Sequence, residues 1–214
     1  MVSAPRLGRG GPRFESGHSD HAGLVDRSNS SLPRSKKGFD SPIPLKMIKK
    51  EYSRILRYQQ EDGWCGPAVV QMALAVGRIR KTQKAVAKDI YQPWWGTTQQ
   101  AIHAYLSKYF SRLNSKNNSK ISDILYHLNK DHAIIVNWWD DINTDPDDAD
   151  GHYCLILDYD QKNRKLVLAD PSERRGIWKM GRKDFNDRWY DAIDLAGKKW
   201  IDGWMLWIDP TSRI

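Results

Sequence analysis

The spacing of apolar positions changes partway along the chain, from a helical period to a strand period. In residues 98–110, Ile102, Tyr105, Leu106 and Tyr109 recur every three or four residues, which predicts a helix with one apolar face. Similar patterns predict helices over residues 66–76, 82–91 and 121–129. Candidate N-caps stand near three of the predicted starts: Thr82, Thr97 or Thr98, and Ser122. Residues 55–58 predict a short strand or an extended lead-in to the first of these helices.

After residue 130 the pattern favours strands. Residues 133–139 are rich in β-branched and aromatic side chains and predict a central strand. Residues 151–159 and 165–170 are two further strand patterns, and the polar turn between them predicts a β-hairpin. Shorter patterns predict a strand at 177–180, a helix at 182–189 and a last strand at 204–208. Helices followed by mostly antiparallel strands indicate an α+β domain with a helical lobe and a sheet lobe.

The first 46 residues differ from the rest in composition. They hold 6 of the 15 glycines, 5 of the 10 prolines and 8 serines, but no Trp, no Tyr and no periodic apolar run. This composition predicts a disordered tail at residues 1–46 and a folded domain at residues 47–214. Residues 10–17 also resemble the product of a transfer-RNA gene translated by mistake. A further hypothesis is therefore that the native protein starts at Met47. A basic nucleic-acid-binding arm is the rival interpretation of the tail.

The polar turn at residues 59–64 leads directly into the apolar segment 69–76, and Cys65 lies where the two meet. A cysteine at the start of a helix sits among unpaired backbone N–H groups and at the positive end of the helix dipole, which favours thiolate over thiol. Pro67 falls in the first turn, where a missing N–H costs nothing. Gly66 lets another backbone approach the sulfur closely. This is the expected setting of an activated nucleophile.

A nucleophile of this kind needs a base, a group that orients the base and an oxyanion donor. His152 stands at the start of one strand of the predicted hairpin, and Asp170 stands at the end of the other. The hairpin would therefore bring both side chains to the same end of the sheet. Gln59, six residues before Cys65, offers a neutral amide donor, with Gln60 as its competitor.

In this order the residues resemble the peptidase C39-like family of papain-like cysteine peptidases. The resemblance covers roughly residues 56–210 and rests on Gln59, Cys65-Gly66-Pro67-Ala68, Gly151-His152-Tyr153, Ala169-Asp170-Pro171, Phe185 and Trp189, and the closing strand. Each motif is short, and their order and spacing together make the signal specific. The chain lacks the transmembrane and ATPase regions of those members that trim bacteriocin leaders during export, so their substrate is not carried over.

The resemblance implies a two-lobed papain-like fold and a set of roles. Cys65 would be the nucleophile, His152 the base, Asp170 the orienting partner and Gln59 the oxyanion donor. The implied activity is hydrolysis of a peptide or amide bond through an acyl-enzyme, with a peptide or protein as substrate and with no cofactor. Two alternatives remain open at this stage: an acyltransferase that passes the same acyl group to an amine, and a peptide-binding domain without catalysis.

Each site residue also has a structural interpretation. Cys65 and His152 could be buried residues without a catalytic role, and Asp170 could cap the turn before Pro171. Asp158 or Asp160 could orient His152 in place of Asp170. Cys154, two residues past His152 and on the same strand face, is expected to pack under the site. His103 and His127 lie on predicted helices, and His132 lacks a matching carboxylate strand.

The loop at residues 140–150 carries six aspartates and invites a calcium interpretation. Asp141, Asn143 and Asp145 match the opening of an EF-hand loop, but Pro146 replaces the turn glycine and His152 replaces the bidentate glutamate. We therefore expect a solvated loop and no metal. Such a loop could raise the pKa of His152 or repel acidic substrates.

Charge and the remaining motifs exclude other classes. Residues 1–46 and residues 47–214 each carry half of the net charge of +8, so the folded part is only mildly basic. The paired tryptophans are expected to fill the core or line a peptide groove, and no nucleic-acid partner is expected. No phosphate-binding loop, CxxC pair or HExxH motif is present.

No signal peptide or membrane segment is recognisable, and with two cysteines a reducing, cytoplasmic compartment is expected. The oligomeric state is not predicted.

Overall fold

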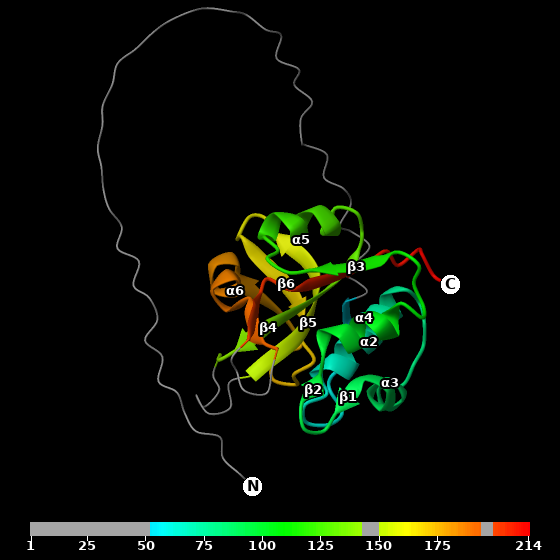
Figure 1. Ribbon diagram of the computed structural model, residues 1–214. Coiled ribbons are helices and arrows are strands. Elements are labelled where there is room, and N and C mark those ends of the chain that lie inside the picture. Colours follow the sequence, from blue (N-terminus) through cyan, green and yellow to red (C-terminus); the bar gives the residue numbers. More distant parts are fainter. Residues whose placement is uncertain (1–51, 143–149, 194–198) are drawn as a thin grey trace, which may run out of the picture. The chain divides into compact units, whose positions relative to one another are not determined.

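A computed structural model describes residues 52–142, 150–193 and 199–214 of the chain. The predicted tail at residues 1–46 and most of the acidic loop lie outside these residues. The described part is built around a six-stranded antiparallel sheet (Figure 1). In spatial order its strands are β3 (Leu113–Lys116), β10 (Met205–Ile208), β4 (Ala133–Asp140), β5 (Asp150–Asp160), β6 (Lys165–Ala169) and β7 (Ile177–Gly181).

One face of the sheet is covered by helices from the first part of the chain. These helices are α1 (Tyr52–Ile55), α2 (Cys65–Val76), α3 (Gln83–Ile90) and α4 (Gln99–Leu106). Val69, Val70 and Leu74 of α2 are fully buried and belong to the same core cluster as Ile135 of β4 and Leu155 of β5. Because α2 is apolar around most of its surface, it becomes the central helix of this layer. The helix that carries Cys65 is therefore held firmly at the sheet.

The other face is covered by α5 (Ile121–Leu128) and α6 (Arg182–Arg188) (Figure 1). Ile121 and Ile124 of α5 and Phe185 of α6 share a second core cluster with Ile134 and Val136 of β4. The helix predicted at residues 121–129 is thus present, but it lies on the opposite face of the sheet from α1, α2, α3 and α4. Successive residues of β4 point to opposite faces, so this strand supports both layers.

Two small antiparallel pairs complete the domain. One joins β1 (Tyr91–Gln92) to β2 (Gly96–Thr97), and the other joins β8 (Tyr190–Ala192) to β9 (Trp200–Asp202). The sequence did not predict either pair, nor the edge strand β3, because segments of two to four residues carry too little alternation.

The predicted helix starts are mostly confirmed. The hydroxyls of Thr82 and Thr98 accept hydrogen bonds from the backbone N–H groups three residues later, as N-caps do. Ser122 was wrong as a cap, because α5 begins one residue earlier with Lys120 at the N-cap position. Residues 55–58 do not form a strand: residue 55 ends α1, and the chain then runs without regular structure toward the turn before α2.

Candidate active site

Cys65 is the first residue of α2 and remains partly exposed. The preceding residue, Trp64, makes no side-chain hydrogen bond to the helix, so the N-cap side chain does not satisfy the first N–H groups of α2. These groups and the helix dipole favour a negative charge at this position. Thr97 packs so closely against Gly66 that a Cβ at position 66 would collide with it. The glycine therefore allows β2 to close over the start of the helix.

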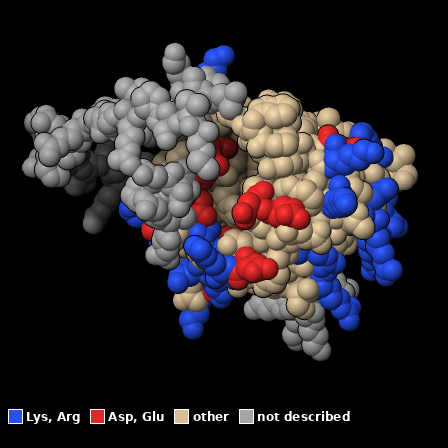
Figure 2. Space-filling model, turned by 90° about the horizontal axis from the view of Figure 1, so that it is seen from below, with Lys and Arg blue, Asp and Glu red and all other residues tan. Residues whose placement is uncertain are grey.

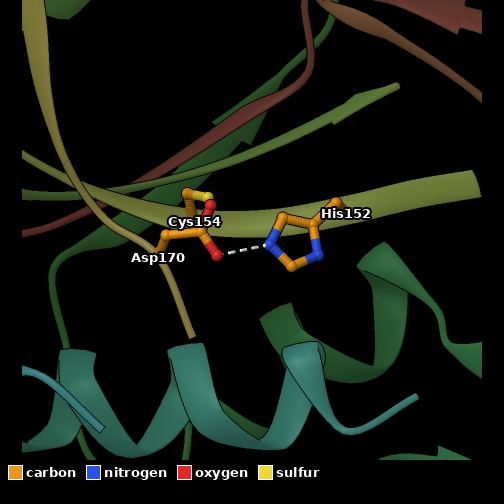
Figure 3. A group of neighbouring side chains, drawn as sticks. All are labelled: His152, Cys154 and Asp170. Atoms are coloured by element: carbon orange, nitrogen blue, oxygen red, sulfur yellow. Dashed lines mark hydrogen bonds and ion pairs between the residues drawn. The ribbon is translucent and has the colours of Figure 1, made fainter. Parts of the chain in front are cut away.

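His152 of β5 lies between a carboxylate and a thiol. Its Nε2 is 2.8 Å from Oδ1 of Asp170, and Cys65 lies close enough to the same ring to raise its pKa. The hairpin of β5 and β6 creates this pairing, because Leu155 is paired with Ala169 and Asp170 follows directly (Figure 3). The predicted meeting of His152 and Asp170 at one end of the sheet is therefore present in the structure.

The surroundings of His152 hold its pKa well above the ordinary value. Burial alone would lower the pKa, whereas the neighbouring Cys154, Asp170 and Cys65 raise it. Burial raises the pKa of the Cys154 thiol to about 12, so this thiol is neutral near pH 7. We therefore attribute the raised pKa of His152 mainly to the Asp170 carboxylate, which contacts its ring at 2.8 Å. A carboxylate in this position stabilises an imidazolium.

Asp170 is fully buried and accepts hydrogen bonds from several directions. Besides His152, its oxygens accept from the backbone N–H of Ser172 (2.9 Å), from Nε1 of Trp178 (3.2 Å) and from the guanidinium of Arg175 (3.3 Å). Burial by itself raises the pKa of Asp170, but these donors and the positive charges of His152 and Arg175 lower it below the usual range. The carboxylate is therefore ionised and fixed in orientation.

Arg175 is the residue of this site that the sequence did not reveal. Its guanidinium contacts Asp170, binds both oxygens of Asp140 (2.5 and 2.8 Å) and lies over the rings of Trp138 and Trp178. Only 15% of its side chain is exposed. In the sequence, the only indication of a role for Arg175 was its position five residues after Asp170. The contact of Arg175 with Asp140 arises only when the sheet folds. Arg175 thus supplies the counter-charge for two carboxylates.

Replacing Arg175 with methionine should lower the free energy of unfolding by about 3–5 kcal/mol, because it leaves two partly or fully buried carboxylates without a counter-charge. Asp170 would then protonate more readily, so the acid limb of Cys65 alkylation should move to higher pH. Urea unfolding and the alkylation rate measured across pH test both effects. Arg174→Met is the matched control, because Arg174 is exposed. Equal effects of the two substitutions would contradict the role given to Arg175.

The other candidates for orienting His152 lie elsewhere. Asp160 binds Lys179 and Asn163 at the hairpin turn. Burial and the adjacent Asp158 carboxylate raise the pKa of Tyr52, which places Asp158 beside α1. Neither carboxylate contacts His152 through any described hydrogen bond, whereas Asp170 does.

The other histidines that the structure describes, His103, His127 and His132, have partners away from Cys65. Nδ1 of His127 and Nδ1 of His132 are 2.9 Å apart, and the His127 ring stacks on Trp207. Burial lowers the pKa of His127 to about 4 and also lowers that of His132. His103 of α4 lies beside Ser107. Among the described residues, His152 is the histidine that lines the same cleft as Cys65.

His152, Cys154 and Asp170 each offer a possible metal-ligand atom, and these atoms lie within 4.8 Å of one another (Figure 3). The candidate ligand atoms of Asp170 and Cys154 are nevertheless already engaged in hydrogen bonds. Both oxygens of Asp170 already accept donors, Cys154 accepts from Nε1 of Trp138 at 3.3 Å, and the positive charge of Arg175 lies alongside. A cation would have to displace these partners, so the geometry favours a hydrogen-bonded group. Cys154 packs under the site, as its strand position predicted.

Cys65 and His152 open onto a cleft of about 800 Å³ between β2 and the start of β5. Gln59 lines this cleft, and its backbone N–H donates to the carbonyl of Pro171, next to Asp170. Gln60 does not line this cleft. Its backbone N–H donates to the side chain of Gln83. The structure therefore brings Gln59, Cys65 and His152 to one cavity, with Asp170 behind the histidine.

A layer of helices that carries Cys65, packed against a large antiparallel sheet that carries His152, is the arrangement of the papain-like cysteine peptidase fold, as predicted. The chain belongs to the Peptidase_C39 like family, whose sequence profile matches residues 52–196. Within the described residues, no helix is both long enough and apolar enough to cross a membrane.

Solved structures of C39 peptidase domains share this fold. The peptidase domain of Streptococcus ComA, a bi-functional ABC transporter of a quorum-sensing pathway, has a TM-score of 0.53 and 15% identity, covering 72% of this chain and 96% of that one. A Bacillus anthracis protein described as a C39-like peptidase has a TM-score of 0.51 and 13% identity, covering 73% and 96%. No curated protein matches the sequence significantly.

Proposed function

We propose that this protein is a cysteine peptidase that cleaves peptide or amide bonds through a Cys65–His152–Asp170 triad. The observation that carries the proposal is the position of His152, which contacts the buried Asp170 at 2.8 Å and lines the same cleft as Cys65 of α2. Membership of the C39-like family supports the same class of reaction. The open cleft next to the thiol supports a peptide as substrate.

The proposed reaction begins with transfer of the Cys65 proton to His152, which gives a thiolate and an imidazolium. The thiolate attacks the scissile carbonyl carbon, and the backbone N–H of Cys65 and the side-chain amide of Gln59 hold the oxyanion. The imidazolium then protonates the departing amine, and the C–N bond breaks. Water, deprotonated by His152, attacks the thioester and releases the acid together with the free thiol. Asp170 keeps the proton on Nε2, so that Nδ1 faces the thiol.

Replacing Gln59 with alanine should reduce kcat by about 10²- to 10³-fold, the usual effect of losing one oxyanion donor. Alkylation of Cys65 by a small reagent should be unchanged, because that reaction forms no oxyanion. Gln60→Ala is the matched control, since Gln60 is exposed and lies outside the cleft. Equal activities of the two variants would remove Gln59 from the mechanism.

Incubation with a peptide library in H₂¹⁸O tests the function itself. Mass spectrometry should detect cleavage products that carry one ¹⁸O in the new carboxylate, and Cys65→Ala should produce none. Products that carry an added amine in place of ¹⁸O would identify an acyltransferase. Capture of peptides by parent and Cys65→Ala alike, without any product, would identify a binding domain.

A further inference from the structure

The cleft has a charge opposite to that of the chain. The chain carries a net charge of +8, yet the described residues that line the cleft include Asp140, Asp150 and Asp191 and neither lysine nor arginine. Figure 2 views the domain from the end at which β4 finishes and β5 starts, and it shows acidic side chains in and beside a hollow at the centre of this face. Such a cleft attracts cations and repels anions.

Two of the three carboxylates have no cationic partner within the part of the chain that the structure describes. Asp140 is held by Arg175, whereas Asp150 and Asp191 form no ion pair within the described residues. Burial and the nearby Asp150 carboxylate together raise the pKa of Asp191 to about 7. Asp191 is therefore a partly buried carboxylate with no counter-cation among the described residues, and a bound cation would stabilise its ionised form.

Asp191 lies next to the reactive groups. Its carboxylate packs on the Cα of Gly151, the residue before His152, so that a Cβ at position 151 would collide with it. The pKa of the buried Tyr153 phenol is raised by burial and by the nearby charges of Asp191, Cys65 and Asp150. These three groups lie near one phenol, and all of them line the same cleft as His152.

A buried amide faces the same carboxylate. Asn137 of β4 is 1% exposed, and its Oδ1 accepts from Nε2 of Gln99 at 3.2 Å. Its Nδ2 lies close enough to Asp191 to lower the pKa of that carboxyl, yet it makes no hydrogen bond of normal geometry within the described residues. An unsatisfied buried N–H favours a negative charge beside it. Asn137 therefore helps to stabilise the ionised form of Asp191, the form that would pair with a cation.

An aromatic wall stands beside the carboxylates. Trp139 lines the cleft, and its ring stacks on Tyr190 at 6.2 Å and meets Trp200 edge-on at 5.3 Å. Tyr190 is the residue before Asp191, so the wall and the carboxylate share strand β8. A fixed tryptophan next to carboxylates is a favourable setting for an ammonium or guanidinium group.

We propose that Asp191, Asp150 and Trp139 form a subsite for an ammonium or guanidinium group of the substrate, beside Cys65. The inference deepens the proposed peptidase function by naming its substrate class, a cationic peptide. The carboxylates would pair with the cation while the Trp139 ring covers it. The subsite would select basic substrates without taking part in bond cleavage.

The charge selectivity of Cys65 modification tests the subsite without a known substrate. Three methanethiosulfonates are compared: the 2-aminoethyl (cationic), methyl (neutral) and 2-sulfonatoethyl (anionic) reagents. Each transfers its RS group to the Cys65 sulfur and releases methanesulfinate. Dividing each rate by that of the neutral reagent removes the intrinsic reactivity of Cys65. Failure of the proposed function, seen as slow reaction with the neutral reagent, is therefore distinguishable from failure of the subsite.

The cationic reagent should react about tenfold faster than the anionic one at low ionic strength, and salt should reduce the ratio. Asp191→Asn should lower the ratio at least about threefold, and Asp150→Asn should lower it as well. Asp187→Asn is the control, because Asp187 is exposed on α6 and pairs with Lys183. A parent ratio near one, or equal ratios in Asp191→Asn and Asp187→Asn, would overturn the proposal. Asp150→Asn and the salt dependence of the parent keep the test valid should Asp191→Asn fail to fold.

Peptide competitors identify the source of the cation. Each peptide is used to slow modification of Cys65, in versions with lysine or acetyl-lysine and with a free or an acetylated amino terminus. Loss of competition on acetylation of lysine would assign the subsite to a side chain, and loss on acetylation of the terminus would assign it to the α-amino group. Equal competition by all four versions would contradict a cation subsite.

Discussion

Replacing His152 with alanine is expected to reduce peptide cleavage by about 10³- to 10⁴-fold, because the substitution removes both the base for Cys65 and the acid for the leaving amine. The loss should fall on kcat, since the carboxylates, aromatic residues and backbone groups of the cleft remain in place. Steady-state kinetics on a peptide found in the library measure the effect.

His103→Ala is the matched control for this substitution. His103 lies on α4 and contacts Ser107, so its removal should leave kcat unchanged. A His152→Ala protein that retains more than about a tenth of the parent activity would show that another group activates the thiol.

Replacing Asp170 with asparagine is expected to reduce kcat by about 10³-fold or more while preserving the shape of the side chain. The amide of asparagine can donate to Nε2 of His152, which places the ring proton on Nδ1 and blocks transfer from Cys65. The substitution also removes the charge that stabilises the imidazolium. Loss of a charged acceptor for Trp178 and Arg175 should cost about 2–3 kcal/mol of unfolding free energy. Kinetics and urea unfolding measure the two effects.

Asp160→Asn is the control for this substitution, because the sequence alone left Asp160 as an alternative partner of His152. Asp160 binds Lys179 and Asn163 at the hairpin turn, so this change should not affect kcat. Loss of activity in Asp160→Asn but not in Asp170→Asn would reverse the assignment.

The hairpin that pairs His152 with Asp170 was predictable because its signal is local. Two apolar runs joined by a polar turn pair in only one sensible way, so residues at the open end of the hairpin must approach each other. The start of α2 was predictable for a similar reason, since the turn, Pro67 and the apolar run lie within a short stretch. Where neighbouring residues decide the structure, the sequence pattern was sufficient.

The surroundings of the site were not predictable in this way. Arg175 meets Asp140 only because β4, β5 and β6 are neighbours in the sheet, and nothing in either segment indicates the other. Asp191 lies in a strand of three residues that carries no pattern of its own, and it reaches the cleft through the packing of β8 beside β4 and β5. These contacts depend on tertiary arrangement, which the spacing of apolar residues does not contain.

The face of the sheet that each helix covers was not predictable from the sequence either. The apolar positions of α5 predicted a helix with a buried face, but the same pattern suits either side of the sheet. Its position opposite α2 follows from the alternation of β4, in which Ile134 and Val136 face α5 while Ile135 faces the other layer. This alternation could be read from the sequence, whereas the assignment of each face to a helix could not.

The rate of Cys65 alkylation by iodoacetamide, measured against pH in the parent and in His152→Ala, tests the central claim most directly. Mass spectrometry locates the label, and the fully buried Cys154 is an internal reference that should remain unlabelled. We predict rapid labelling of Cys65 that persists below about pH 7, where an ordinary thiol is mostly protonated, and that is lost in His152→Ala. Slow labelling that follows an ordinary thiol titration near about pH 8.5, unchanged by the substitution, would contradict a paired nucleophile.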